Sequence, residues 1–131
     1  MVTDEESSLL KHASARERPN GQDDQSMPSS HASRSAVLTE LGRRNMQWIA
    51  VSATERAVID AGLTGLTLAT GWARVEGGFH YPSDVLVGMA IGDFNGAFFN
   101  DAFMGLPEPG RVAFAVEPVH AGARLLVRLV W

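Results

Sequence analysis

The spacing of apolar and polar positions predicts four helices within the first hundred residues. We expect them over about residues 4–17, 28–44, 53–70 and 81–103. The first ends at the sequence RPNG, in which Pro19 and Gly21 are strong helix breakers, and the second has Pro28 in its first turn. The third carries a polar stripe along one side, made of Arg56, Asp60, Thr64 and Thr67.

Glycine recurs every four residues in the fourth predicted helix, at Gly88, Gly92 and Gly96, on the same face as Asp84. A second ridge is apolar and consists of Leu86, Ala90, Phe94 and Phe98. Because each glycine in a helix interior costs about 1 kcal/mol, three of them indicate a face that packs closely against a neighbouring backbone. We attribute this face to tight packing in a soluble bundle rather than to a membrane dimer.

The pattern changes to a period of two after the sequence GLPEPG. RVAFAV and ARLLVRLVW then predict two strands around a turn near EPVHAG, with Leu125, Val127, Leu129 and Trp131 on one face. The expected fold class is therefore mostly α, a helical bundle with a short C-terminal β-hairpin. The expected boundaries are 1–104 for the helical domain, 105–110 for a linker and 111–131 for the hairpin.

Composition narrows the function classes. A chain of 131 residues is one domain, and its net charge of -4 argues against a nucleic-acid partner. The absence of cysteine excludes disulfides and thiolate metal sites. The acidic first residues do not resemble a signal peptide. No stretch reads as a confident transmembrane helix, since residues 61–73 are too few and residues 85–104 contain two aspartates and two asparagines.

Two histidines lie at predicted helix starts. In HYPSD, Pro82 opens a helix directly after His80, and Asp84 falls in the first turn. We expect the Asp84 carboxylate to accept a hydrogen bond from one ring nitrogen of His80, which leaves the other nitrogen with its lone pair outward as a nucleophile. His31 lies in the first turn of another helix, in the sequence MPSSHAS. Because helix N-termini present unpaired N–H groups, the two ends suggest an anion held between the histidines.

Three cations accompany the histidines: Lys11, Arg18 and Arg74. Arginine binds phosphate oxygens in pairs, and lysine adds a point charge. The neighbouring Arg16 and Glu17 are interpreted as a solvated helix face, and Arg43 and Arg44 as charges that offset a helix dipole. His12 and His120 are interpreted as surface residues.

These residues fall into three spaced motifs: K-x6-R-P from Lys11 to Pro19, P-S-x-H from Pro28 to His31, and R-x5-H-x3-D from Arg74 to Asp84. In this order, they resemble the type-2 phosphatidic acid phosphatase and vanadium haloperoxidase superfamily. The resemblance covers roughly residues 9–103. It implies a hydrolase of phosphoric monoesters that needs no metal and no cofactor, and whose substrate is a lipid, an isoprenoid or a soluble phosphate.

The resemblance also implies a role for each residue. His80 would attack phosphorus and become a phosphohistidine, Asp84 would orient it, and His31 would protonate the leaving oxygen and later activate water. The phosphoryl oxygens would be held by Lys11, Arg18, Arg74, Ser29 and backbone N–H groups near Ser30. The implied partner is a phosphorylated small molecule or a lipid head group. A periplasmic or membrane-associated location and a peripheral membrane contact are implied as well, while the oligomeric state is left open.

The chain departs from the family pattern in three places. Ser30 replaces the usual glycine of the second motif, and Ala73 replaces the usual serine before Arg74. Members usually have helices before the first motif, whereas this sequence starts about ten residues ahead of it, so a fragment and a minimal form are both open.

Three other functions stay open. A vanadium haloperoxidase would hold vanadate in the same pocket. An inactive module would bind an anion or a partner without turnover. A metal site could use His80, Asp84 and His31, although converging cations would repel a metal ion.

Overall fold

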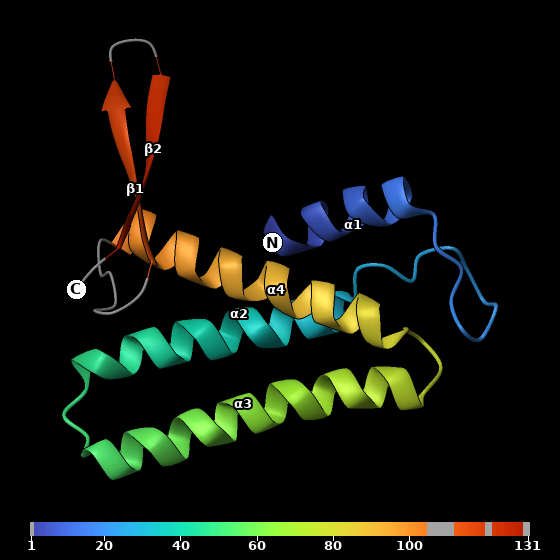
Figure 1. Cartoon of the computed structure of the whole chain (residues 1–131), viewed down its shortest axis with the longest axis horizontal. Helices are drawn as coiled ribbons and strands as arrows, with labels where there is room; N and C mark the ends of the chain where they lie inside the picture. Colours follow the sequence, from blue (N-terminus) through green and yellow to red (C-terminus); the bar gives the residue numbers. More distant parts are fainter. Residues whose placement is uncertain (1, 105–111, 120–121, 130–131) are drawn as a thin grey trace.

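A computed structural model describes residues 2–104, 112–119 and 122–129, and it is mostly helical (Figure 1). Its elements are α1 (Val2–Ser14), α2 (Ser30–Asn45), a short 3-10 helix (Met46–Trp48), α3 (Ala53–Glu76), α4 (Pro82–Phe99), a π-helical turn (Asn100–Met104), β1 (Val112–Val119) and β2 (Gly122–Leu129). The predicted class, a helical bundle with a terminal hairpin, is confirmed.

The helix boundaries differ from the prediction in ways that local contacts explain. Helix α2 begins at Ser30 rather than at Pro28, because the Ser29 side chain caps the helix by accepting a hydrogen bond from the Ala32 backbone N–H. Helix α3 continues past Thr70 to Glu76. Gly71 does not interrupt it, since the missing side chain makes room for Val85 and Met89 of α4.

The glycine face of α4 packs directly on α2, as predicted. A Cβ atom at Gly88 would lie 2.5 Å from the Ser29 carbonyl oxygen. One at Gly92 would overlap the Ser33 carbonyl oxygen and lie 2.7 Å from the Ala36 side chain. The two backbones can approach this closely only because α4 has no side chain at these glycine positions.

Replacing Gly92 with alanine is expected to destabilise the fold by about 1–3 kcal/mol, because the added methyl group must push α4 away from α2. The matched control is Gly65→Ala on α3, where no described atom lies within 4 Å of the added Cβ. That control should stabilise the helix by up to about 1 kcal/mol, since alanine is the better helix former. Urea unfolding followed by circular dichroism measures the free energy of unfolding of both variants. A change of the same sign in both would contradict close packing of α2 against α4 at Gly92.

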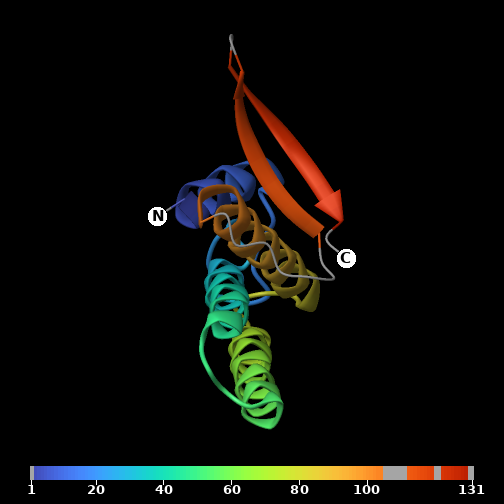
Figure 2. The same cartoon turned by 90° about the vertical axis from the view of Figure 1, so that its left-hand side faces the viewer.

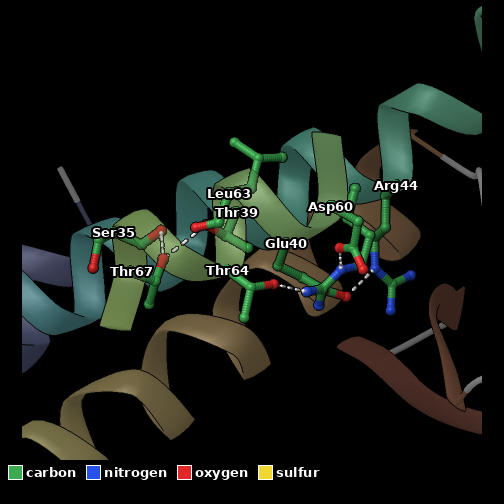
Figure 3. A network of polar contacts seen from close by, with 9 residues as sticks. Ser35, Thr39, Glu40, Arg44, Asp60, Leu63, Thr64 and Thr67 are labelled. Carbon is green, nitrogen blue, oxygen red and sulfur yellow. Dashed lines mark hydrogen bonds and ion pairs between the residues drawn. The ribbon is translucent and has the colours of Figure 1, made fainter. Parts of the chain in front are cut away.

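The interface between α2 and α3 is polar (Figure 3). The Thr39 and Thr67 hydroxyls lie 2.8 Å apart, and Thr67 also donates to the Ser35 carbonyl at 3.2 Å. Arg43 donates to Asp60 at 2.5 Å and to Thr64 at 3.0 Å. Three residues of the predicted polar stripe, Asp60, Thr64 and Thr67, therefore contact α2.

Large apolar side chains lie on the outside of the bundle. Trp72 of α3 is 69% exposed and Leu86 of α4 is 66% exposed. Other exposed examples are Leu38, Trp48, Val58, Leu66, Leu68 and Phe94. Within the described part of the chain, no helix is both long enough and apolar enough to span a bilayer.

The hairpin rises from the end of the bundle at which α4 finishes (Figure 2). Its strands are antiparallel, and Phe114↔Val127 and Val116↔Leu125 are among the register pairs. Phe114 anchors its base through edge-on contacts with Phe94 and Phe98, and its backbone N–H donates to Asp101 at 3.1 Å. The predicted linker at 105–110, the hairpin tip at 120–121 and Trp131 lie outside the described residues.

Candidate functional site

The three motifs meet at one end of the bundle. Figure 1 shows the C-terminal ends of α1 and α3 and the N-terminal ends of α2 and α4 on the same side of the molecule. Hydrogen bonds tie the connecting segments together there. The Ser29 backbone N–H donates to the Asp84 carbonyl at 3.0 Å, and the Asn20 backbone N–H donates to the Gly78 carbonyl at 3.1 Å. Residues far apart in sequence are thereby brought to a single site.

The loop between α3 and α4 positions His80. The Arg74 carbonyl accepts hydrogen bonds from the backbone N–H groups of Phe79 at 3.1 Å and His80 at 3.2 Å, which accounts for the fixed spacing between Arg74 and His80. Gly78 makes this turn possible with a φ of +68°, a value that other residues rarely adopt. As predicted, His80 lies just before a helix that has Pro82 in its first turn; Tyr81 caps this helix and Asp84 is its third residue.

The His80 ring is held by a backbone carbonyl. Its Nδ1 atom lies 2.6 Å from the carbonyl oxygen of Ser26, and the residue is only 2% exposed. Because a carbonyl oxygen can only accept a hydrogen bond, Nδ1 carries the proton in this contact, and the lone pair of the neutral ring is on Nε2.

The predicted hydrogen bond between His80 and Asp84 is therefore wrong, because the Ser26 carbonyl is the partner of His80 Nδ1. The Asp84 Oδ2 atom accepts hydrogen bonds from the Ser26 hydroxyl at 2.5 Å and from the Tyr81 backbone N–H at 2.8 Å. Its Oδ1 atom forms an ion pair with Arg16 Nη1 at 2.7 Å. The carboxylate is thus occupied by these three partners, and the carbonyl of Ser26 takes the place next to His80 that we expected Asp84 to fill.

Arg16 and Ser26 are therefore site residues that the sequence analysis missed. Arg16 does not form a solvated helix face, since it bonds Asp84 and the Ser83 hydroxyl and lies over the Tyr81 ring at 4.2 Å. It lies just after the end of α1, two residues before Arg18. Its position inside the first motif was the one sign in the sequence that Arg16 belongs to the site. Only the fold shows that its side chain contacts Asp84 of the third motif.

His31 occupies the second position of α2 and is exposed. The pKa of His31 is lowered, chiefly by partial burial and then by the positive charges of Arg74, Arg34, Lys11 and Arg18. Arg34, one helical turn beyond His31, is a nearby cation that the sequence analysis also missed.

The pKa of His80 is lowered as well. Burial is the largest cause, the bond to the Ser26 carbonyl opposes it, and the charges of Arg18, Arg74 and Lys11 lower it further. The charges of the same three predicted cations therefore act on both histidines.

Each cation has its own surroundings. Arg18 Nε donates to Asp23 at 2.5 Å, and its Nη1 lies 3.5 Å from the Phe79 carbonyl. Arg74 stacks over the Phe79 ring at 4.1 Å, and its buried Nε has no hydrogen-bond partner among the described residues.

Lys11 is on the last turn of α1. Its pKa is lowered, first by burial and then by the charge of Arg18, which indicates that positive charge is concentrated here. Such a concentration favours an anionic ligand.

The two serines of the second motif differ in their environments. Ser29 is fully buried, and its hydroxyl serves as the cap of α2. Ser30 is the first residue of α2 and is partly exposed. Of the two hydroxyls, that of Ser30 is the one open to a ligand at the helix N-terminus.

The residues named for a metal site are not grouped as ligands. Over the described ranges, no three histidine, aspartate or glutamate side chains lie close enough together to hold one metal ion. The Asp84 carboxylate faces Arg16 and Ser26 instead.

Comparisons with known proteins agree with the motifs. A family model described as the PAP2 superfamily matches residues 3–103, which include all three motifs, α2 to α4, and α1 except for its first residue. No curated protein and no solved structure matched the chain. At the level of the superfamily, the match supports a phosphatase-type hydrolase of phosphoesters. Because the matched segment covers most of the sequence, the chain belongs to the PAP2 superfamily.

Proposed function

We propose that this protein is a metal-independent phosphatase that hydrolyses phosphomonoesters through a phosphohistidine at His80. The observation that carries the proposal is the bond between His80 Nδ1 and the Ser26 carbonyl, which leaves Nε2 unprotonated beside three cations. An imidazole nitrogen with a free lone pair is a nucleophile, and the surrounding positive charge favours a phosphate group. The substrate is a phosphorylated small molecule or a lipid head group.

The first step forms the bond between His80 Nε2 and phosphorus and breaks the bond between phosphorus and the ester oxygen. Lys11, Arg18 and Arg74 neutralise the charge on the phosphoryl oxygens, with Ser30 and the backbone N–H groups of the α2 N-terminus beside them. His31 gives its proton to the leaving oxygen. The lowered pKa of His31 makes it a stronger acid for this transfer.

The second step returns the enzyme to its starting state. Neutral His31 takes a proton from water, the water oxygen attacks phosphorus, and the bond between phosphorus and Nε2 breaks. Inorganic phosphate leaves, and the His80 ring is neutral again, with its proton still on Nδ1. Splitting hydrolysis in this way replaces one difficult step with two easier ones.

Replacing His31 with alanine is expected to slow hydrolysis according to the leaving group. An alkyl phosphate, whose alkoxide leaves poorly without a proton, should lose about 10²–10⁴-fold in kcat/KM. For p-nitrophenyl phosphate, whose leaving group is a stable anion, we expect a much smaller loss. The measurement is kcat/KM for both substrates in the presence of a chelator. Equal losses for the two substrates would overturn the assignment of His31 as general acid.

Other outcomes of the same assay would identify a different function. Turnover that the chelator abolishes would indicate a metal enzyme. Halide oxidation that depends on vanadate would indicate a haloperoxidase. Phosphate binding without turnover would indicate a binding module.

A further inference from the structure

We infer that Ser26 is a positioning residue through which Asp84 and Arg16 fix the orientation of the His80 ring. Ser26 lies in the loop before α2 and belongs to none of the three motifs. The inference rests on the proposed function, in which His80 is the nucleophile.

Ser26 connects the carboxylate to the histidine with two different groups of one residue. Its hydroxyl donates to Asp84 Oδ2 at 2.5 Å, and its carbonyl accepts from His80 Nδ1 at 2.6 Å. The residue has no exposed surface, so water does not compete for either bond. Fixing the Ser26 hydroxyl against Asp84 limits the rotation of the Ser26 backbone, and this in turn fixes the direction of the carbonyl that the imidazole meets.

Arg16 closes the network from the other side. The Ser26 backbone N–H donates to the Arg16 carbonyl at 2.9 Å, while Arg16 Nη1 donates to Asp84 Oδ1 at 2.7 Å. Arg16, Ser26 and Asp84 thus form a closed ring of hydrogen bonds in which each residue contacts the other two. All three bonding groups of Ser26, its N–H, hydroxyl and carbonyl, are used.

This arrangement gives Asp84 an indirect effect on catalysis. The carboxylate holds Ser26, and the Ser26 carbonyl holds the proton of His80 on Nδ1, so that Nε2 keeps its lone pair. Because the bond from Ser26 raises the pKa of His80, weakening that bond should lower this pKa and let the proton exchange between the two ring nitrogens.

The test is Ser26→Ala, which removes the hydroxyl and keeps the carbonyl. The ¹⁵N signals of His80, assigned by their absence from His80→Ala, report which ring nitrogen carries the proton. We expect the wild-type ring to be protonated on Nδ1 when neutral, and Ser26→Ala to show a mixture and a lower pKa. The kcat for p-nitrophenyl phosphate should fall about 10- to 100-fold, the range for a hydrogen bond to a charged group, with a smaller change in KM.

Ser33→Ala is the matched control. Ser33 is as fully buried as Ser26, but its hydroxyl has no hydrogen-bond partner in the part of the chain that the structure describes. It should leave the His80 signals and kcat unchanged. If Ser26→Ala behaves like Ser33→Ala in both measurements, the inference is wrong.

Two further variants keep the test decisive. Ser26→Cys retains most of the volume and only a weak donor, so it should shift the His80 signals in the same direction if Ser26→Ala does not fold. Asp84→Asn removes the charge facing Arg16. When it is combined with Ser26→Ala, the loss in kcat should be little more than the larger of the two single losses, because both changes break the same network. Fully additive effects would contradict an action of Asp84 through Ser26.

The spectroscopic measurement also separates this inference from the proposed function. If the wild-type protein hydrolyses no phosphoester but Ser26→Ala still moves the His80 proton, the positioning role stands and the proposed function fails. If hydrolysis through His80 is found and Ser26→Ala changes neither measurement, the proposed function stands and the positioning role fails.

Discussion

Hydrolysis of p-nitrophenyl phosphate should fall by a factor of roughly a thousand or more when His80 is replaced with alanine. The alanine side chain offers no atom that can bond to phosphorus, so the covalent route is lost. What remains is the stabilisation of charge by Lys11, Arg18 and Arg74, which binds phosphate without supplying a nucleophile. The experiment compares initial rates of the two purified proteins with a chelator present.

A second histidine supplies the matched control for His80→Ala. His12 lies on α1 one residue after Lys11 but is exposed, and it has no place in the proposed mechanism. His12→Ala should therefore keep wild-type rates.

The phosphohistidine intermediate can be trapped directly. Because phosphohistidine is labile in acid, the reaction should be stopped with alkali after mixing with a substrate labelled in its phosphate group, and the label should then be found on the protein. If the His80→Ala variant retains label, or turns over substrate as fast as the wild type, the assignment of His80 as the nucleophile is wrong.

Stability should respond most strongly at the opposite end of α2, where Arg44 is buried. Arg44 is 2% exposed, donates to Glu40 at 2.6 Å, and forms a second ion pair with Asp101. Asp101 also accepts the backbone N–H of Phe114, so the same group ties the bundle to the hairpin. Replacing Arg44 with alanine would take a shared counterion from two buried carboxylates, and we expect a loss of about 3–5 kcal/mol in the free energy of unfolding.

The adjacent Arg43 provides the control for Arg44. It pairs with Asp60, whose side chain is 43% exposed, so solvent screens that pair. Its contact with Glu40, at 3.3 Å, is longer than the 2.6 Å bond from Arg44 to the same carboxylate, so Glu40 keeps a partner when Arg43 is replaced. Arg43→Ala should cost about 1 kcal/mol or less. Urea unfolding monitored by circular dichroism compares the two variants directly. Equal losses would show that burial of the network does not decide its contribution to stability.

Local patterns in the sequence were enough to predict several parts of the fold. The helical period located α1 to α4, although α3 continues past the predicted end at Thr70 to Glu76, and the alternation in the last twenty residues located the hairpin. The glycine spacing predicted that one face of α4 lies against another backbone, because only a missing Cβ allows such an approach. Each of these features depends on residues within a few turns of one another.

The orientation of α3 was not predictable in the same way. Its stripe of Asp60, Thr64 and Thr67 has the spacing of a solvent-exposed face, yet it contacts Arg43 and Thr39 of α2. A polar face can be buried when a neighbouring helix offers matching donors and acceptors. The pattern on one helix does not reveal whether its neighbour does so.

The sequence by itself determined the helices, the hairpin, and the order of the three motifs with His31 and His80 in the second and third, because motif spacing and periodicity are properties of a continuous chain. Only the tertiary structure decided that Asp84 holds Ser26 and Arg16 rather than His80, and that Arg44, in the last turn of α2, is buried in ion pairs with Glu40 and Asp101. Ser26 and His80 are more than fifty residues apart in sequence, and they become neighbours only when the glycine face of α4 packs against α2. Hydrogen bonds select their partners by distance in space, and that distance is fixed by how the helices pack.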